Sequence, residues 1–362
     1  MTELLPTPTE QELLLPEGHI EPAQPTPVLA DYVAPQASRI GSGDSRALIT
    51  LVGLVTVFIL AGGTTFVVLN GTTAHLAHQS LPAETAAAVA STSTENPFAS
   101  VRLQAQSAYV YDMQTQQVLY TLNPDAERPM ASLTKIAMAL AVSEVLPLDS
   151  TITIPYDTAP VSSAEVLTKG SVWTVRDVLN FTLIASSNQG ADILGRAAND
   201  PLHVKYPLSP QSGTTVWRMN KLVRDLGLTD MLFSNDSGLD LSSTESGAYG
   251  SARDVGTLVA YAASTSLDLF TETTQNTMTF KNAAGMTATA YNTDTALGAI
   301  PGIVMGKTGY TDLAGGNLAV VFDAAGIGHP VVAVVMGSTI DGRFSDMKQL
   351  VDASRIAVAA GQ

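Results

Sequence analysis

The chain has no cysteine among its 362 residues. This absence excludes disulfides, a thiol nucleophile, thiolate metal ligands and a lipidated cysteine. Histidine is scarce too, and only His75 and His78 stand close together, with no carboxylate nearby to complete a metal site. We therefore expect neither a metal nor a cofactor. His19 lies in the N-terminal tail, and a serine–histidine–aspartate triad would have to use His203 or His329.

Basic residues are also few. The chain has 18 Lys and Arg against 33 Asp and Glu, a formal net charge of −15. Such an acidic excess argues against nucleic acid, or an anionic surface, as the main partner. No Lys or Arg occurs between Arg46 and Arg102.

That stretch contains an uncharged and mostly apolar run, residues 47–69. As a helix, its 23 residues would rise about 34 Å, enough to cross a hydrocarbon core of about 30 Å. Arg39 and Arg46 precede the run, so the positive-inside rule predicts a cytoplasmic N-terminus and an extracytoplasmic remainder. A cleaved signal peptide is the alternative, but the run is long and the tail before it is extended. We predict a single-pass protein of the cell membrane.

Composition divides the rest of the chain into three parts. Residues 1–46 are rich in Pro, Glu, Gln and Ala and lack apolar periodicity, which predicts a disordered cytoplasmic tail. Residues 70–96 are small, polar and Ala-rich, and as a flexible linker they would span roughly 30 Å. Residues 97–362 are predicted to form the folded domain.

Within this domain, strand patterns occur at both ends and helical patterns between them. Residues 107–123 indicate two strands around a turn at Met113–Gln116, and residues 315–338 indicate two more strands joined by a hairpin. Helical periodicity marks residues 132–146, 174–198, 215–228, 251–264 and 346–360. The economical arrangement is α+β: one antiparallel sheet built from the terminal strands, with helices packed on it.

A serine and a lysine stand three residues apart in Ser132-Leu133-Thr134-Lys135, where a helix is predicted to begin. Positions i and i+3 share a helix face, so the hydroxyl and the amine could meet. The positive end of the helix dipole would stabilise negative charge on the serine oxygen and favour a neutral amine that can act as a base. Taken alone, the pattern is more often a serine that caps a helix.

Ser186-Ser187-Asn188 interrupts a helical stretch. One interpretation is a serine cap for the second helix. The other is a hydroxyl that passes a proton, beside an amide that hydrogen-bonds a substrate peptide group.

Lys307-Thr308-Gly309 is predicted to open a strand, where the glycine lets another backbone approach closely. A substrate along this strand could be held by main-chain hydrogen bonds. Lys307 and Thr308 would then offer a cation and a hydroxyl to a carboxylate.

In this order, S-x-x-K, S-x-N and K-T-G form the signature of penicillin-recognising serine enzymes. Flanking phrases such as "SNDSGLD" and "GKTGYTDLAGGNL" extend the likeness over about residues 100–355. The chain resembles the D-alanyl-D-alanine carboxypeptidases, the serine-type low-molecular-mass penicillin-binding proteins. The resemblance implies their fold, shared with serine β-lactamases: an antiparallel sheet flanked by helices, with a helical subdomain. Here the transmembrane helix would precede it.

The resemblance also implies a role for each motif residue. Ser132 would be the nucleophile that forms an acyl-enzyme, Lys135 its base, and Ser186 the relay of a proton to the leaving amine. A second cation, Lys307, would help to keep the Lys135 amine neutral. The backbone N–H groups of Ser132 and Tyr310 would form the oxyanion hole. The substrate itself would be bound by Asn188, Lys307, Thr308, Gly309 and Arg343.

The sequence departs from the family pattern at Ser187 and Gln189, which we do not expect to disturb the chemistry. It also stops at Gln362, without the second, β-rich domain and C-terminal membrane helix of many relatives. We therefore expect a monomer that is anchored by its N-terminal helix.

The leading prediction is a D,D-carboxypeptidase that removes the terminal D-Ala from peptidoglycan stem peptides and is inhibited by β-lactams. A D,D-endopeptidase acting on cross-links would use the same residues. A serine β-lactamase would need a water positioned for deacylation, for which Glu272 and Asn276 have suggestive spacing. A non-catalytic protein that binds the cell wall is the fourth alternative.

Overall fold

The structure is a computed structural model that describes residues 96–157 and 167–361. The predicted tail, the predicted transmembrane segment 47–69 and nearly all of the linker lie outside the described residues, so these three remain predictions. Within the part that is described, no helix combines the length and the apolar character needed to cross a membrane.

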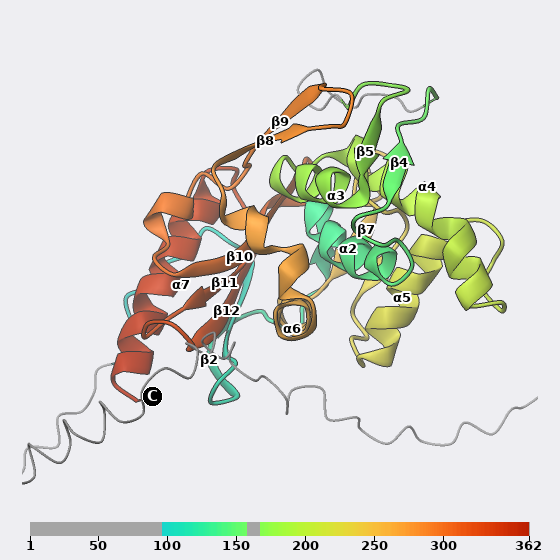
Figure 1. Cartoon of the computed structure of the whole chain (residues 1–362). Coiled ribbons are helices and arrows are strands. Elements are labelled where there is room, and N and C mark those ends of the chain that lie inside the picture. Colours follow the sequence, from blue (N-terminus) through green and yellow to red (C-terminus); the bar gives the residue numbers. More distant parts are fainter. Residues whose placement is uncertain (1–95, 158–166, 362) are drawn as a thin grey trace, which may run out of the picture.

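A five-stranded antiparallel sheet forms the centre of the fold, in the strand order β10-β11-β12-β1-β2 (Figure 1). Its strands come from both ends of the folded part, because β1 pairs with β12 through Ser107 opposite Met336. The predicted sheet of terminal strands is therefore confirmed. The strands are β1 (Ser107–Asp112), β2 (Gln117–Leu122), β10 (Ile303–Thr311), β11 (Gly315–Asp323) and β12 (Pro330–Ser338).

Two of the three inner strands, β11 and β12, are buried on both faces, which explains why they are almost continuously apolar. Since successive side chains alternate between faces, Leu318 and Val320 pack with α7 (Gly342–Ala359), while Ala319 belongs to the core shared with α6 (Ala252–Thr265). Figure 1 shows α7 along one side of the sheet and α6 on the side toward the other helices.

Those other helices form the predicted helical part around α2 (Lys135–Ser143). Residues 136–142 of α2 are all buried, because α2 packs against α4, α5 and α6. The predicted polar break separates α3 (Val175–Ile184) from α4 (Asn188–Lys205), and α5 (Thr214–Asp225) follows. Ser251 caps α6, since its side chain accepts a hydrogen bond from the Asp254 N–H.

Short elements complete the described chain. They are β3 (Arg128–Pro129), β6 (Leu232–Phe233) and β7 (Ala248–Gly250), which pair in the order β3-β7-β6; the pair β4 (Thr151–Thr153) and β5 (Val172–Thr174); the pair β8 (Thr277–Lys281) and β9 (Thr287–Tyr291); and the 3-10 turns η1 (Ala131–Thr134), η2 (Leu267–Leu269), η3 (Thr271–Thr274) and η4 (Leu297–Ala299).

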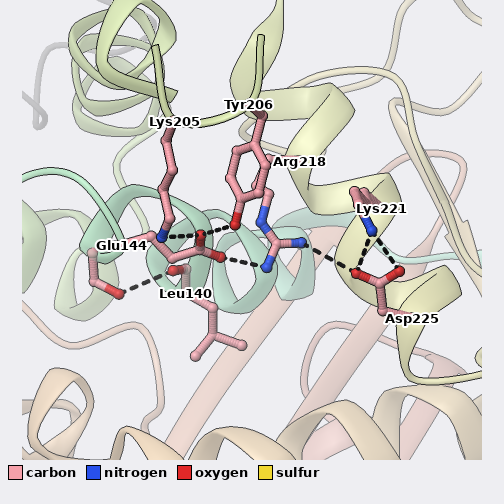
Figure 2. A network of polar contacts seen from close by, with 8 residues as sticks. Leu140, Glu144, Lys205, Tyr206, Arg218, Lys221 and Asp225 are labelled. Atoms are coloured by element: carbon pink, nitrogen blue, oxygen red, sulfur yellow. Dashed lines mark hydrogen bonds and ion pairs between the residues drawn. The ribbon is translucent and has the colours of Figure 1, made fainter. Parts of the chain in front are cut away.

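A network of charged groups joins the C-terminal ends of α2 and α4 to α5 (Figure 2). Glu144, just after α2, pairs with Arg218 and accepts hydrogen bonds from Lys205 Nζ (2.9 Å) and Tyr206 Oη (2.7 Å). The Arg218 side chain is only 11% exposed and lies over the Tyr206 ring. Burial would raise the pKa of Glu144, but the hydrogen bonds from Arg218, Lys205 and Tyr206 outweigh it and hold the pKa below its ordinary value.

We expect Glu144→Gln to lower the free energy of unfolding at neutral pH by on the order of 3 kcal/mol, because it removes the nearer charged partner of the buried Arg218 guanidinium and leaves it only Asp225, at 3.9 Å. The pKa of Glu144 is lower in the folded protein. Its stabilising contribution is therefore complete above the unfolded pKa of about 4.3 and is lost as the pH falls through the folded value. Urea denaturation of both proteins from neutral pH downward measures the difference.

The control for this prediction is Lys221→Met, in the same region. It removes an exposed pair with Asp225 (2.8 Å) and should cost no more than about 0.5 kcal/mol. A destabilisation by Glu144→Gln that stays constant down to about pH 3 would contradict the assigned charge pairing.

Candidate active site

Ser132 lies in η1, the 3-10 turn that leads into α2. Neither η1 nor α2 has a side-chain cap, so Ser132 stands at the helix start without capping it. Its Oγ instead accepts a hydrogen bond from Lys135 Nζ at 2.7 Å. Ala131, just before it, has a φ of +48°, a conformation that costs a non-glycine residue of order 1 kcal/mol or more and needs support from its surroundings.

Lys135 is completely buried, with 0% exposure. Its Nζ donates to Ser132 Oγ, to Asn188 Oδ1 at 2.7 Å and to the Ser237 carbonyl oxygen at 2.9 Å. The three acceptors belong to η1, to α4 and to the loop after β6. Because three separate elements hold the amine, it stays beside the hydroxyl that the i, i+3 spacing brings near it.

The break between α3 and α4 fits both interpretations of Ser186-Ser187-Asn188, the helix cap and the hydroxyl that passes a proton. Ser187 caps α4, because its Oγ accepts the Gly190 N–H at 3.0 Å. Ser186 has a φ of +58°, and its Oγ accepts a hydrogen bond from the buried Lys307 Nζ at 2.8 Å. The capping residue and the residue that faces the second lysine are therefore neighbours.

The Lys307-Thr308-Gly309 motif lies in the middle of β10, and the prediction that it opens the strand is wrong. The strand already pairs with β11 from Ile303, opposite Phe322. In this register Gly309 lies against η1. A Cβ added to Gly309 would lie 2.8 Å from the Met130 carbonyl oxygen and 3.2 Å from the Ser132 nitrogen. Glycine is needed there because the two backbones leave no room for a side chain.

Arg343, the second residue of α7, completes the cluster. It is 7% exposed, and its Nη1 donates to the Gly309 carbonyl oxygen at 2.8 Å. Burial lowers the pKa of the Arg343 guanidinium, against the attraction of Asp294 and Asp341. A pocket of about 200 Å³ lies between these elements and is lined by Ser132, Ala185, Ser186, Asn188, Thr293, Thr308, Tyr310 and Arg343. Tertiary folding thus brings the three motifs and Arg343 to one place.

Three residues of the site carried no motif in the sequence. Thr293 lines the pocket and hydrogen-bonds Thr308 through their hydroxyls. Ser237 holds Lys135 through its carbonyl oxygen. Asn317 of β11 donates to the carbonyl oxygens of Pro129 (3.0 Å) and Met130 (3.1 Å), which ties the segment before Ser132 to the sheet. Ser237 and Asn317 stand in the flanking phrases that extend the family likeness, and Asn317 is also an amide in an otherwise apolar strand, whereas Thr293 had no signal in the sequence.

The other candidate groups lie elsewhere. His203 contacts Ser209 and His329 contacts Asp112, so neither contact joins a histidine to Ser132. Glu272 lies in η3 and Asn276 follows it, and neither lines the pocket. Across residues 96–157 and 167–361, no group of three His, Asp or Glu side chains could hold a metal ion.

Comparison with known proteins agrees with this geometry. A D-alanyl-D-alanine carboxypeptidase of Mycobacterium tuberculosis is 29% identical over 58% of this chain and 67% of the relative. A D-alanyl-D-alanine endopeptidase of Escherichia coli is 27% identical over 74% of this chain and 81% of the relative.

Among solved structures, penicillin-binding protein D2 of Listeria monocytogenes in its ampicillin-bound form is 26% identical and superposes with a TM-score of 0.58, over 70% of this chain and 98% of that one. This likeness confirms the predicted penicillin-binding protein fold. The family model for D-alanyl-D-alanine carboxypeptidase matches residues 90–339, well over half of the sequence. The chain therefore belongs to the D-alanyl-D-alanine carboxypeptidase family.

Proposed function

We propose that this protein is a serine-type D,D-carboxypeptidase that removes the terminal D-Ala from peptidoglycan stem peptides through an acyl-enzyme on Ser132. The observation that carries the proposal is the hydrogen bond of 2.7 Å between Lys135 Nζ and Ser132 Oγ, inside a chain of this family. A buried amine against the Ser132 hydroxyl, beside a pocket lined by hydroxyls and by Arg343, suits attack on a peptide carbonyl next to a carboxylate.

In the acylation step Lys135 is neutral, so it keeps two N–H donors, for Asn188 Oδ1 and the Ser237 carbonyl oxygen, and turns its lone pair toward Ser132. The lone pair takes the proton of the Ser132 hydroxyl as Oγ bonds to the carbonyl carbon of the penultimate D-Ala. Complete burial of the Lys135 side chain disfavours a charged amine. The backbone N–H groups of Ser132 and Tyr310 would receive the oxyanion, and the close approach that Gly309 allows brings β10 to the Ser132 turn.

The tetrahedral intermediate then collapses with release of D-Ala. The leaving nitrogen needs a proton, which the Ser186 hydroxyl would donate. Ser186 would recover the proton that Lys135 took from Ser132, so Lys135 is neutral again, while Lys307 Nζ holds the Ser186 oxygen by its hydrogen bond. Lys307, Thr308 and Arg343 would bind the terminal carboxylate, and the Asn188 amide would orient the substrate peptide. Attack of water on the Ser132 ester releases the shortened peptide and restores the hydroxyl.

The test is mass spectrometry of a pentapeptide that ends in D-Ala-D-Ala, incubated with the full-length protein. We expect the mass of one D-Ala to be lost, and prior exposure to penicillin to block the loss, since a β-lactam would acylate the same serine. No D-Ala release together with no uptake of labelled penicillin would refute the proposal.

A D,D-endopeptidase acting on cross-links is the second candidate. It is favoured by the Escherichia coli relative of that name, of which the chain covers 81%. Whole peptidoglycan sacculi separate the two activities, because a carboxypeptidase releases D-Ala whereas an endopeptidase converts cross-linked dimers to monomers.

We also propose that residues 47–69 anchor the protein in the cell membrane with its catalytic domain outside the cytoplasm. The uncharged run and the two arginines before it support this arrangement. Protease added to spheroplasts should degrade the catalytic domain and spare an N-terminal tag. Protection of both ends would contradict the proposed orientation.

A further inference from the structure

Asp294 lies directly behind the strand that carries the Lys307-Thr308-Gly309 motif. Its neighbour Thr293 faces the pocket, whereas Asp294 itself is only 3% exposed. An added Cβ on Gly306, the residue before Lys307, would lie 3.5 Å from Asp294 Oδ2. The carboxylate therefore packs against the back of β10 at the position of the site's second lysine.

The hydrogen bonds of Asp294 account for only one of its two oxygens. Oδ1 accepts the Ala296 N–H at 2.9 Å. Oδ2 is fully covered and has no hydrogen-bond partner within the described structure, and the same holds for Nε of Arg343. A buried carboxylate oxygen left without a partner is costly unless nearby charges stabilise it.

Two charges do so, Lys307 on β10 and Arg343 on α7, and both attract the Asp294 carboxylate. Burial raises the pKa of Asp294 above its ordinary value, against the Ala296 N–H and these two cations. Three other acids lie nearby. Asp341, just before α7, also attracts Arg343 but is exposed, Glu272 of η3 is partly exposed, and Asp346 of α7 is engaged with the backbone N–H groups of residues 104 and 105. Two cations and one buried acid, Asp294, thus share the carboxylate-binding end of the pocket.

We propose that Asp294 is a positioning residue that sets the net charge of the carboxylate-binding end of the pocket, and with it the affinity for substrates that carry a free C-terminal carboxylate. The inference rests on the proposed function. With Asp294 ionised, one of the two positive charges is already balanced and the substrate balances the other. Without its charge, both cations act on the substrate carboxylate, in a buried region where charge interactions are strong.

The test substitutes Asp294→Asn, which keeps an oxygen for the Ala296 N–H and removes the charge. The substrates are two D-alanyl thioesters that differ only in whether the leaving group carries a carboxylate. We expect KM for the carboxylate substrate to fall roughly threefold to tenfold, with kcat unchanged, and KM for the uncharged one to stay the same. Asp294→Glu, which retains the charge, should stay close to wild type.

The pH dependence provides a readout that a merely structural role would not change. Protonation of Asp294 removes the same negative charge, so the wild-type KM for the carboxylate substrate should fall as the pH is lowered through the raised pKa of Asp294. The Asn variant should lack this change. This measurement on the wild type needs no substitution, so it decides the question even if the variant folds poorly.

A matched control is Asp254→Asn on α6. Asp254 is also buried, at 8% exposure, and burial raises its pKa, but it does not line the pocket. It should leave both KM values unchanged. If wild type and Asp294→Asn cleave the carboxylate thioester with the same KM and the same pH dependence, the role proposed for Asp294 is wrong while the proposed function stands. If the wild type cleaves neither the pentapeptide nor the thioesters, both proposals fall.

Discussion

Replacing Ser132 with Ala is expected to abolish D-Ala release and labelling by penicillin. The hydroxyl that lies against Lys135 Nζ is that of Ser132, and it would form the ester. Loss of a serine nucleophile reduces kcat in serine hydrolases by a factor on the order of 10^4 to 10^6. Mass spectrometry of the pentapeptide and gel detection of fluorescent penicillin measure the two losses.

The Ser132→Ala protein should remain folded, which separates lost chemistry from lost structure. The substitution removes a single hydroxyl, and Lys135 Nζ keeps its bonds to Asn188 and to the Ser237 carbonyl oxygen. Thermal unfolding should therefore stay close to wild type. Ser143→Ala, at the other end of α2, is the matched control, because it removes only a bond to the Leu140 carbonyl oxygen and should leave activity intact. Stoichiometric penicillin labelling of Ser132→Ala would contradict the assignment of the nucleophile.

Replacing Lys135 with Met is expected to slow acylation of Ser132 by a factor on the order of 10^3 to 10^4, toward the upper end of what general-base catalysis contributes. Methionine is similar in length and apolar, so it can occupy the fully buried position of Lys135. Without the amine, the hydroxyl has no group to take its proton. The rate of acylation by fluorescent penicillin, measured in reactions that are quenched before the acyl-enzyme is hydrolysed, tests this prediction.

The pH dependence distinguishes the two variants. Acylation of Lys135→Met should rise with pH, because hydroxide can partly replace the missing base, whereas Ser132→Ala should remain unlabelled at every pH. Lys348→Met is the control for the same substitution at an exposed lysine, which pairs with Asp352 outside the pocket, and it should acylate normally. If Lys135→Met were acylated at the wild-type rate, the proposed role of Lys135 as the base for Ser132 would be wrong.

The sequence alone determined the features that depend on short-range patterns. The strands at both ends and the helices between them follow from periods of two and of 3.6 residues, which reflect which side of an element is buried. The meeting of Ser132 and Lys135 was also predictable, because three residues along a helical turn place two side chains on one face. The residue types of the three motifs indicated the chemistry.

Only the tertiary structure decided how these local pieces meet. The bond between Lys307 and Ser186 joins residues that are 121 positions apart, and it exists because β10 packs beside the break between α3 and α4. The support of Ser132 by Asn317, and the place of Asp294 behind the motif strand, depend on the same packing. Contacts between distant segments arise from how the sheet and the helices bury each other's apolar faces, which no local spacing encodes. The sequence could therefore name the reacting groups, whereas the fold determined which groups hold them in place.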